Sequence, residues 1–184
     1  MRSDARLNRE RLLAAAAEVV AEEGTQASLR EVARRAGVGL GTLYRNFATR
    51  DELIQALLGS RFTQLARRAE ELAAEREPGP ALTAWLAEYL AHSTVYRGLT
   101  SSVMSTLEAA DGPLAQACAG MREAAGALLA AAQEAGAVRA DVDRVDLIAL
   151  VSAVGWIADE APTLAGRTDR HLAVVLAGLT APPG

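Results

Sequence analysis

The stretch that decides the fold is residues 28–47, SLREVARRAGVGLGTLYRNF. Its apolar spacing predicts a short helix over 29–35, a turn over 36–39 that contains two glycines, and a second short helix over 40–46. Two short helices joined by a tight glycine-containing turn form a helix-turn-helix. Short helical hairpins also occur in many all-α proteins, so the spacing alone leaves the role of the motif open.

Two capping boxes mark helix starts around this motif. The Ser28 hydroxyl is expected to accept a hydrogen bond from the Glu31 amide, while the Glu31 carboxylate reaches back to the Ser28 amide. Thr49 and Glu52 repeat the pattern at the start of a long helix. Gly24 is a stop signal for the preceding helix, because glycine tolerates the left-handed conformation of a helix end.

The remaining chain is also predicted to be helical. Ala and Leu, which are good helix formers, dominate the apolar residues, and β-branched residues form short clusters rather than alternating runs. Residues 78–80, Pro-Gly-Pro, are expected to break the chain. We predict an all-α fold of about nine helices, with a three-helix helix-turn-helix domain over 1–50 and a C-terminal helical bundle over 51–184. The predicted helices cover 5–23, 29–35, 40–46, 50–76, 81–93, 99–109, 113–135, 142–160 (capped by Asp141 or Asp143) and 169–179.

The charge of the chain is unevenly distributed. Residues 1–50 hold nine arginines against six acidic residues, whereas residues 51–184 hold ten against seventeen. A basic N-terminal region on an otherwise acidic chain favours nucleic-acid binding by that region, although charge differences of this size between two parts of a chain are common. No apolar run is long enough for a transmembrane helix and no signal-peptide core is visible, so a cytoplasmic protein without membrane contact is expected. The single Cys118 allows no internal disulfide, His92 and His171 lack metal-ligand spacing, and neither a metal nor a cofactor is expected.

From Gly24 to Leu53 the sequence resembles the tetracycline-repressor (TetR) family of bacterial regulators. The matching segments are SLREVARRAGV at 28–38, GTLYRNF at 41–47 and TRDEL at 49–53. At motif level the resemblance covers the N-terminal quarter to third of the chain, and the later helices match the family only in length and layout. The sequence departs from the family at Gly39 and Leu40, where many members carry Ser or Thr and then Lys, and at Arg45, where His is frequent.

The resemblance implies that the second short helix is the recognition helix. Such a helix presents its N-terminal residues to base edges in the major groove. Thr42 offers a hydroxyl and a methyl group, Tyr44 and Arg45 are long enough to reach phosphates or bases, and Leu43 and Phe47 are expected to point into the core. Helix starts supply further phosphate donors. The predicted DNA-contacting residues are Ser28, Gly39, Leu40, Gly41, Thr42, Tyr44, Arg45, Thr49 and Arg50, and Arg2, Arg6 and Arg9 are expected to form a basic arm near the DNA.

The resemblance also implies a ligand-binding region after residue 53. Aromatic, polar and sulfur-containing side chains are mixed over 85–107 and could line an amphipathic cavity, although plain core packing explains any one of them. The predicted pocket residues are Phe62, Trp85, Tyr89, His92, Tyr96, Met104, Cys118, Met121 and Trp156.

Two C-terminal helices carry more apolar surface than one contact covers. The helix predicted over 142–160 is apolar nearly all round, and the helix over 169–179 has a broad apolar face. In the family these helices pair with their twofold mates in a four-helix bundle; the alternative is that both lie inside the core of one chain. The predicted interface residues are Ile148, Val151, Gly155, Leu172, Val175, Leu176 and Leu179.

The sequence therefore favours a ligand-responsive transcriptional regulator. The resemblance implies a repressor that binds a near-palindromic double-stranded operator as a homodimer and is released by a small-molecule effector. The alternative is an all-α module that binds a small molecule or a partner without specific DNA binding, which Gly39 and Leu40 support. An enzyme is not expected, because the sequence shows no Ser-His-Asp pattern, phosphate loop or metal cluster.

Overall fold

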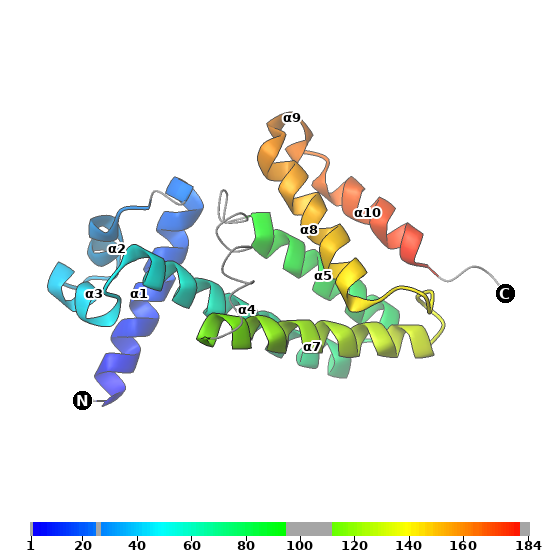
Figure 1. Cartoon of the computed structure of the whole chain (residues 1–184), viewed down its shortest axis with the longest axis horizontal. Coiled ribbons are helices and arrows are strands. Elements are labelled where there is room, and N and C mark those ends of the chain that lie inside the picture. The colour runs from blue at the N-terminus through cyan, green and yellow to red at the C-terminus, as the bar shows by residue number, and fades with distance from the viewer. Residues whose placement is uncertain (1, 25–26, 95–111, 181–184) are drawn as a thin grey trace. The chain divides into compact units, whose positions relative to one another are not determined.

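The structure is a computed structural model that describes residues 2–24, 27–94 and 112–180. Within those residues every regular element is a helix, and the helices can be followed in Figure 1, so the predicted all-α fold is confirmed. The helix predicted over 99–109 lies outside the described residues, and one short helix near residue 162 was not predicted. The described helices are α1 (Arg2–Glu23), α2 (Leu29–Arg35), α3 (Leu40–Asn46), α4 (Arg50–Glu75), α5 (Pro78–Thr94), α7 (Pro113–Glu134), α8 (Arg144–Glu160), α9 (Pro162–Ala165) and α10 (Thr168–Leu179).

The chain folds as two compact units, and α4 belongs to both. The first unit includes α1, α2, α3 and α4 as far as Arg61, and the second begins at Phe62 and includes α5, α8 and α10. The boundary predicted from the sequence lies at residues 50–51, where α4 begins. The division lies inside α4 because its buried leucines continue at helical spacing past that point, with Leu57 in the first unit and Leu65 in the second.

The first unit is built on the apolar stripe of α1. This helix packs against α2, and α2 packs against α3. Leu12 of α1, Val32 of α2 and Leu43 of α3 are fully buried, and Phe47 directly after α3 is 1% exposed. The prediction that Leu43 and Phe47 point into the core is confirmed, and their burial fixes which face of α3 remains outside.

The turn between α2 and α3 is fixed by one glycine. Gly37 has a φ of +66°, in the left-handed region that glycine adopts without strain. The Gly37 amide donates to the carbonyl of Arg34, and the Val38 amide donates to the carbonyl of Ala33, which together form a Schellman motif. This motif ends α2 and lets α3 begin at residue 40.

The two predicted capping boxes differ in outcome. The Ser28 side chain makes no capping hydrogen bond, and its amide donates to the Glu23 carboxylate at 3.0 Å. Glu31 does not reach back, because Arg34 and Arg35 both bind its carboxylate. The box predicted at Ser28 is therefore wrong. At the start of α4 the Glu52 amide donates to Thr49 Oγ1 at 3.1 Å, while the Glu52 carboxylate accepts from the Ala48 amide at 2.8 Å.

The second unit has one continuous apolar core. Trp85 and Leu86 of α5 and Leu147 of α8 are fully buried in it, and α8 packs against α5 and α10. Residues 78–80 do not break the chain as predicted: Pro78 opens α5, a position where a missing amide donor costs nothing. An isolated bridge joins Val138 to Thr180 at the end of α10.

The start of α8 settles the choice between the two predicted caps. Asp143 is the N-cap: its carboxylate accepts from the amides of Val145 and Asp146, and the Asp146 side chain completes a capping box. Across the described ranges, no helix combines the length and apolar character that a membrane span requires.

Candidate functional site

The outward face of α3 carries small residues and two long side chains. Gly41, Tyr44 and Arg45 are exposed at helical spacing, and Ala48 continues this line just past the helix. Tyr44 is 48% exposed, whereas Leu43 on the opposite side is fully buried. The small residues on this face allow α3 to approach another molecule closely, and Tyr44 and Arg45 are long enough to contact it.

The glycines that flank Leu40 are not required by packing within the protein. A Cβ atom built on Gly39 or Gly41 would meet nothing within 4 Å, and neither glycine adopts a left-handed conformation. Their small size therefore provides clearance on the outside of the first unit, where Leu40 itself is only partly buried.

A hydrogen bond within α3 orients one of the two long side chains. Arg45 Nη2 donates to Thr42 Oγ1 at 2.9 Å, one helical turn back. Asn46 Nδ2 also donates to the Thr42 carbonyl oxygen, at 2.8 Å. The Arg45 guanidinium is therefore held over the exposed surface of α3, toward the N-terminal end of that helix.

Arg9, which was predicted to be part of a basic arm, makes contacts within the first unit. Its guanidinium lies 4.4 Å from the centre of the Phe47 ring, and Nη1 donates to the Asn46 carbonyl oxygen at 3.3 Å. A cation at the carboxyl end of a helix is favourable because the last carbonyls carry partial negative charge. Arg9 therefore ties α1 to the end of α3, and Arg2 and Arg6 belong to the first turns of the same helix α1.

Arg35 ties α2 to the carboxyl end of α1. It binds both oxygens of Glu22 and, at 2.8 Å, the carboxylate of Glu31. Hydrogen bonds from Arg34 and Arg35 hold the pKa of Glu31 at about 2, and those to Glu22 and Glu31 raise the pKa of Arg35. The Glu31–Arg35 spacing is readable from the sequence, but the Glu22–Arg35 pair requires the fold.

All nine predicted DNA-contacting residues belong to the first unit, on α3, at the start of α4 or just before a helix, and none of the nine is buried. Thr49 is exposed and Arg50 is half-buried. The helix starts at Ser28 and Thr49 therefore belong to the same unit as the outward face of α3.

Three predicted pocket residues of the second unit are packed within its core. Trp85, Cys118 and Met121 are buried core residues. Trp85 Nε1 donates to the Leu65 carbonyl oxygen at 2.8 Å, and its ring stacks on Tyr89 with centroids 5.5 Å apart. Core packing, the alternative in the sequence analysis, accounts for these side chains.

Tyr89 makes a partly buried polar contact beside this core. Its hydroxyl lies 2.8 Å from Ser152 Oγ, which connects α5 to α8. Burial raises the pKa of Tyr89 and that of Cys118, so both groups remain protonated at neutral pH. Phe62 packs against the core from its edge.

Three other predicted pocket residues have different positions. Trp156 is 53% exposed on α8. Its position could not be predicted, because the periodicity of a helix that is apolar all round does not show which side packs inward. Tyr96 and Met104 lie outside the described residues.

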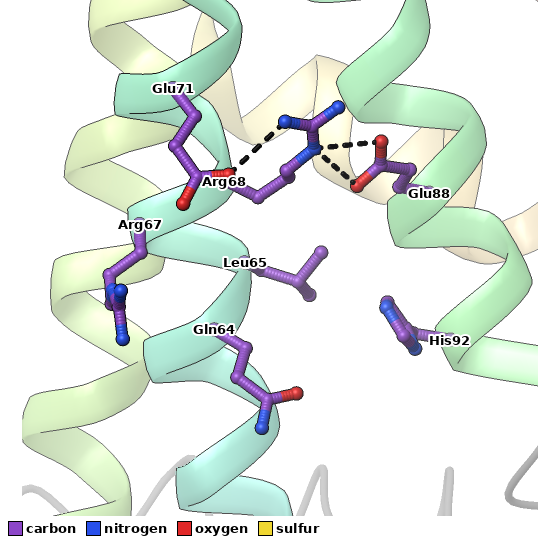
Figure 2. A pocket seen from close by; sticks show the side chains of 7 residues that line it. All are labelled: Gln64, Leu65, Arg67, Arg68, Glu71, Glu88 and His92. Carbon is purple, nitrogen blue, oxygen red and sulfur yellow. Dashed lines mark hydrogen bonds and ion pairs between the residues drawn. The ribbon is translucent and has the colours of Figure 1, made fainter.

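A groove between α4 and α5 is lined in part by one predicted pocket residue, His92 (Figure 2). Its volume is about 320 Å³. Arg68 Nε crosses from α4 to the Glu88 carboxylate at 3.1 and 3.2 Å, and Arg68 Nη1 binds Glu71 at 3.1 Å. The lining residues are Gln64, Leu65, Arg67, Arg68, Glu71, Glu88 and His92.

The outer sides of α8 and α10 expose large apolar side chains. Val145 is 67% exposed, Leu150 47%, and Val174 64%, and Trp156 belongs to the same set. We call these four residues the α8/α10 apolar surface. Its members are not those predicted, because several predicted interface residues pack inside their own chain. Val151, Gly155, Leu172 and Leu179 are buried, and Ile148, Val175 and Leu176 are partly buried against the core.

Two family models match the chain. Residues 12–57 match the model for bacterial regulatory proteins of the tetR family, which includes the helix-turn-helix. Residues 77–181 match the model for the C-terminal domain of SbtR-like transcriptional regulators. The second match alone spans more than half of the chain.

Individual relatives agree with the family models. The HTH-type transcriptional regulator SAR0097 of Staphylococcus aureus (strain MRSA252) is 33% identical over 82 residues, a match that spans 43% of this chain and 42% of that relative. The TetR transcriptional regulator SCO0520 from Streptomyces coelicolor is 34% identical with a TM-score of 0.77, over 95% of this chain and 99% of that one.

A second solved structure gives the same result. The TetR transcription regulatory protein from Mycobacterium vanbaalenii is 33% identical, with a TM-score of 0.69 over 98% of this chain and 99% of that one. Sequence motif, both family models and full-length structural similarity agree: the chain belongs to the TetR family of bacterial transcriptional regulators.

Proposed function

We propose that the protein is a homodimeric transcriptional repressor that binds a near-palindromic operator and is released from it by a small-molecule effector. The observation that carries the proposal is the outward face of α3. Tyr44 and Arg45 project from it beside Gly41, while Leu43 anchors the opposite side in the core. A recognition helix needs this combination, because it must enter the major groove without losing its position on the domain.

The proposed DNA complex makes two kinds of contact. The residues of α3 face base edges, while Thr49 and Arg50 at the start of α4 contact phosphates, which position a protein without reading sequence. In a dimer the two recognition helices enter successive major grooves about 34–36 Å apart. Affinity is expected to fall steeply with salt, because each phosphate contact releases counterions.

The α8/α10 apolar surface supports the homodimer. Val145, Trp156 and Val174 are more than half exposed on two helices that pack against each other, and exposed apolar surface is characteristic of interaction sites. A second copy that presents the same surface would cover them by twofold symmetry. Sedimentation of the wild-type protein at micromolar concentration tests this part, and a pure monomer would contradict it.

The groove between α4 and α5 is the proposed effector site. Its lining is mostly charged and polar, with Arg67, Arg68 and Glu71 on α4 and Glu88 on α5, which favours a polar, charged effector. A ligand that binds Arg68 competes with its bridge to Glu88 and so changes how α4 is held against α5. Because α4 continues into the first unit, this change provides a route to the DNA-binding helices.

An electrophoretic shift assay with DNA from upstream of the protein's own gene tests the proposal. The expected result is a specific shifted complex that survives excess competitor DNA and weakens as salt is raised. Equal binding to a scrambled fragment of the same length, or no binding, would favour the module without specific DNA binding. Genome-wide capture of bound DNA then gives the operator sequence and the regulated genes, and those genes indicate the class of effector.

A further inference from the structure

One side chain on the outward face of α3 has the chemistry to read a particular base. Arg45 is the only charged residue of α3, and no acidic residue occurs between Val38 and Arg50. The nearest acidic residue after the helix is Asp51. Arg45 is exposed, and the hydrogen bond it makes is to a neutral hydroxyl, that of Thr42. Its charge is therefore not neutralised by a carboxylate of its own helix.

The bond to Thr42 places the Arg45 guanidinium at a defined position. Nη2 donates to Thr42 Oγ1 at 2.9 Å, which draws the side chain back by one turn toward the start of α3. The N-terminal part of a recognition helix is the part that meets base edges, whereas its far end lies nearer the backbone. One N–H is used in this bond, and the remaining N–H groups of the planar fork stay available for a second acceptor.

We propose that Arg45 reads a guanine in each operator half-site through its O6 and N7 atoms, and that Thr42 is the positioning residue that orients it. The inference rests on the proposed function and adds the base that is recognised. Guanine presents two adjacent acceptors in the major groove. Adenine and thymine present one acceptor beside a donor or a methyl group, and cytosine presents a donor, so a fork of donors fits guanine alone.

Tyr44 and Arg50 are assigned to the DNA backbone instead. Tyr44 has a single hydroxyl, which cannot make the paired contact that distinguishes guanine. Arg50 is the first residue of α4 and so belongs to a different helix from the groove-facing stripe. This division predicts that substitution of Arg45 changes the base preference, whereas substitution of Tyr44 or Arg50 does not.

Selection of bound sequences from a random DNA library tests the inference with the full-length protein. The wild type is expected to select a motif with a fixed guanine in each half-site. The Arg45→Ala variant is expected to lose preference at that position and keep the rest of the motif, with affinity for the selected site reduced about 10- to 100-fold. Arg45→Gln is expected to shift the preference from guanine to adenine, since glutamine pairs with adenine N6 and N7.

The salt dependence of binding separates a base contact from a phosphate contact. Loss of a base contact leaves the slope of log affinity against log salt unchanged, whereas loss of a phosphate contact lowers it by about one. Arg50→Ala is the matched comparison, since it removes an identical side chain and is expected to weaken all sequences equally. A guanine that persists in the Arg45→Ala selection, or a slope that falls by about one in that variant, would overturn the inference.

Thr42→Val tests the positioning role, because valine keeps the shape and a methyl group but removes the acceptor. The preference for guanine is expected to fall several-fold, and Thr42→Ser to restore it. Wild-type preference in Thr42→Val would overturn the role of Thr42. A wild type that selects no motif overturns the proposed function and this inference together, whereas a motif unaffected by Arg45 overturns the inference alone.

Discussion

The guanidinium of Arg9 lies 4.4 Å from the centre of the Phe47 ring, and its Nη1 donates to the Asn46 carbonyl oxygen. Arg9 belongs to α1, while Asn46 is the last residue of α3 and Phe47 follows it. The contact therefore fixes the recognition helix at its carboxyl end, while Leu43 fixes it from beneath. A residue predicted to be part of a basic arm thus also holds the end of α3 in place.

Arg9→Ala is expected to destabilise the protein by about 0.5–1 kcal/mol, the range for an exposed cation–π contact. DNA affinity should fall modestly because α3 is held less firmly, while the salt slope of binding stays unchanged. Arg11→Ala is the matched control, since it removes the same charge from an exposed position of α1. Chemical denaturation and DNA titrations at several salt concentrations measure both effects. A salt slope lowered by about one in Arg9→Ala would instead support a phosphate contact.

Tyr44→Ala is expected to weaken DNA binding about 10-fold through loss of a hydrogen bond to a charged phosphate. Its melting temperature should match the wild type, because Tyr44 is 48% exposed and not part of the core. Tyr44→Phe, which keeps the ring and removes the hydroxyl, separates hydrogen bonding from ring contact. Unchanged DNA affinity in Tyr44→Ala would show that the assignment of this residue is wrong.

Val174→Glu is expected to convert the dimer to a monomer, because a charge at a buried interface loses its hydration without a partner. Val174 is 64% exposed in the single chain, so the fold of the monomer should survive. Operator affinity should fall with the loss of paired half-site binding. Ala130→Glu, at an exposed position of α7, is the control. Sedimentation velocity and circular dichroism distinguish dissociation from unfolding, and a Val174→Glu variant that stays dimeric would contradict this interface.

The Glu31 carboxylate makes stability depend on acid pH. Hydrogen bonds to Arg34 and Arg35 lower its pKa from 4.5 to about 2. A lowered folded-state pKa contributes stability that is fully present above the unfolded value and is lost as pH falls through the folded value. Glu31→Gln should therefore be less stable than wild type at pH 7, and the difference should shrink between about pH 4.5 and pH 2. Denaturation curves over this range measure it; a constant difference would exclude the ionised carboxylate as its source.

Gly79 of α5 lies close to Ala137 in the loop after α7. A Cβ at this position would lie 2.9 Å from the Ala137 Cβ. Gly79→Ala is expected to cost about 1–3 kcal/mol, as overpacking does elsewhere. Gly120→Ala, where an added Cβ meets nothing within 4 Å, should instead stabilise the α7 helix by about 0.5–1 kcal/mol. Thermal melts of the two variants should move in opposite directions, and equal shifts would contradict the packing argument.

Local patterns predicted much of this protein. The helix-turn-helix was readable because Leu43 and Phe47 recur at helical spacing after a turn whose Gly37 adopts a left-handed φ. These signals lie within a few residues of one another, so no knowledge of distant segments is needed. The predicted DNA-contacting face of α3 depends on the same local spacing, and the residues assigned to it are the accessible ones.

The hydrogen-bond partners of side chains could not be predicted in this way where the two groups lie on different segments or where several groups compete. The sequence pairs Ser28 with Glu31 in a capping box, but Glu23, Arg34 and Arg35 compete for the same groups. Arg9 carries a charge that suits DNA equally well, and only the fold places it beside the carbonyl of Asn46. Which partner wins depends on distances that the fold sets.

The sequence by itself determined that the chain is helical, that residues 29–46 form a helix-turn-helix and that α3 presents Tyr44 and Arg45, because helical periodicity and turn chemistry are local. Only the tertiary structure decided that Trp85 and Met121 lie in the core and that Trp156 lies outside. Burial of an apolar side chain is about equally favourable against any apolar surface, because the free energy depends on the area removed from water and not on direction. The residue type therefore does not show which surface buries it. Packing of α5, α7 and α8 against one another makes that choice.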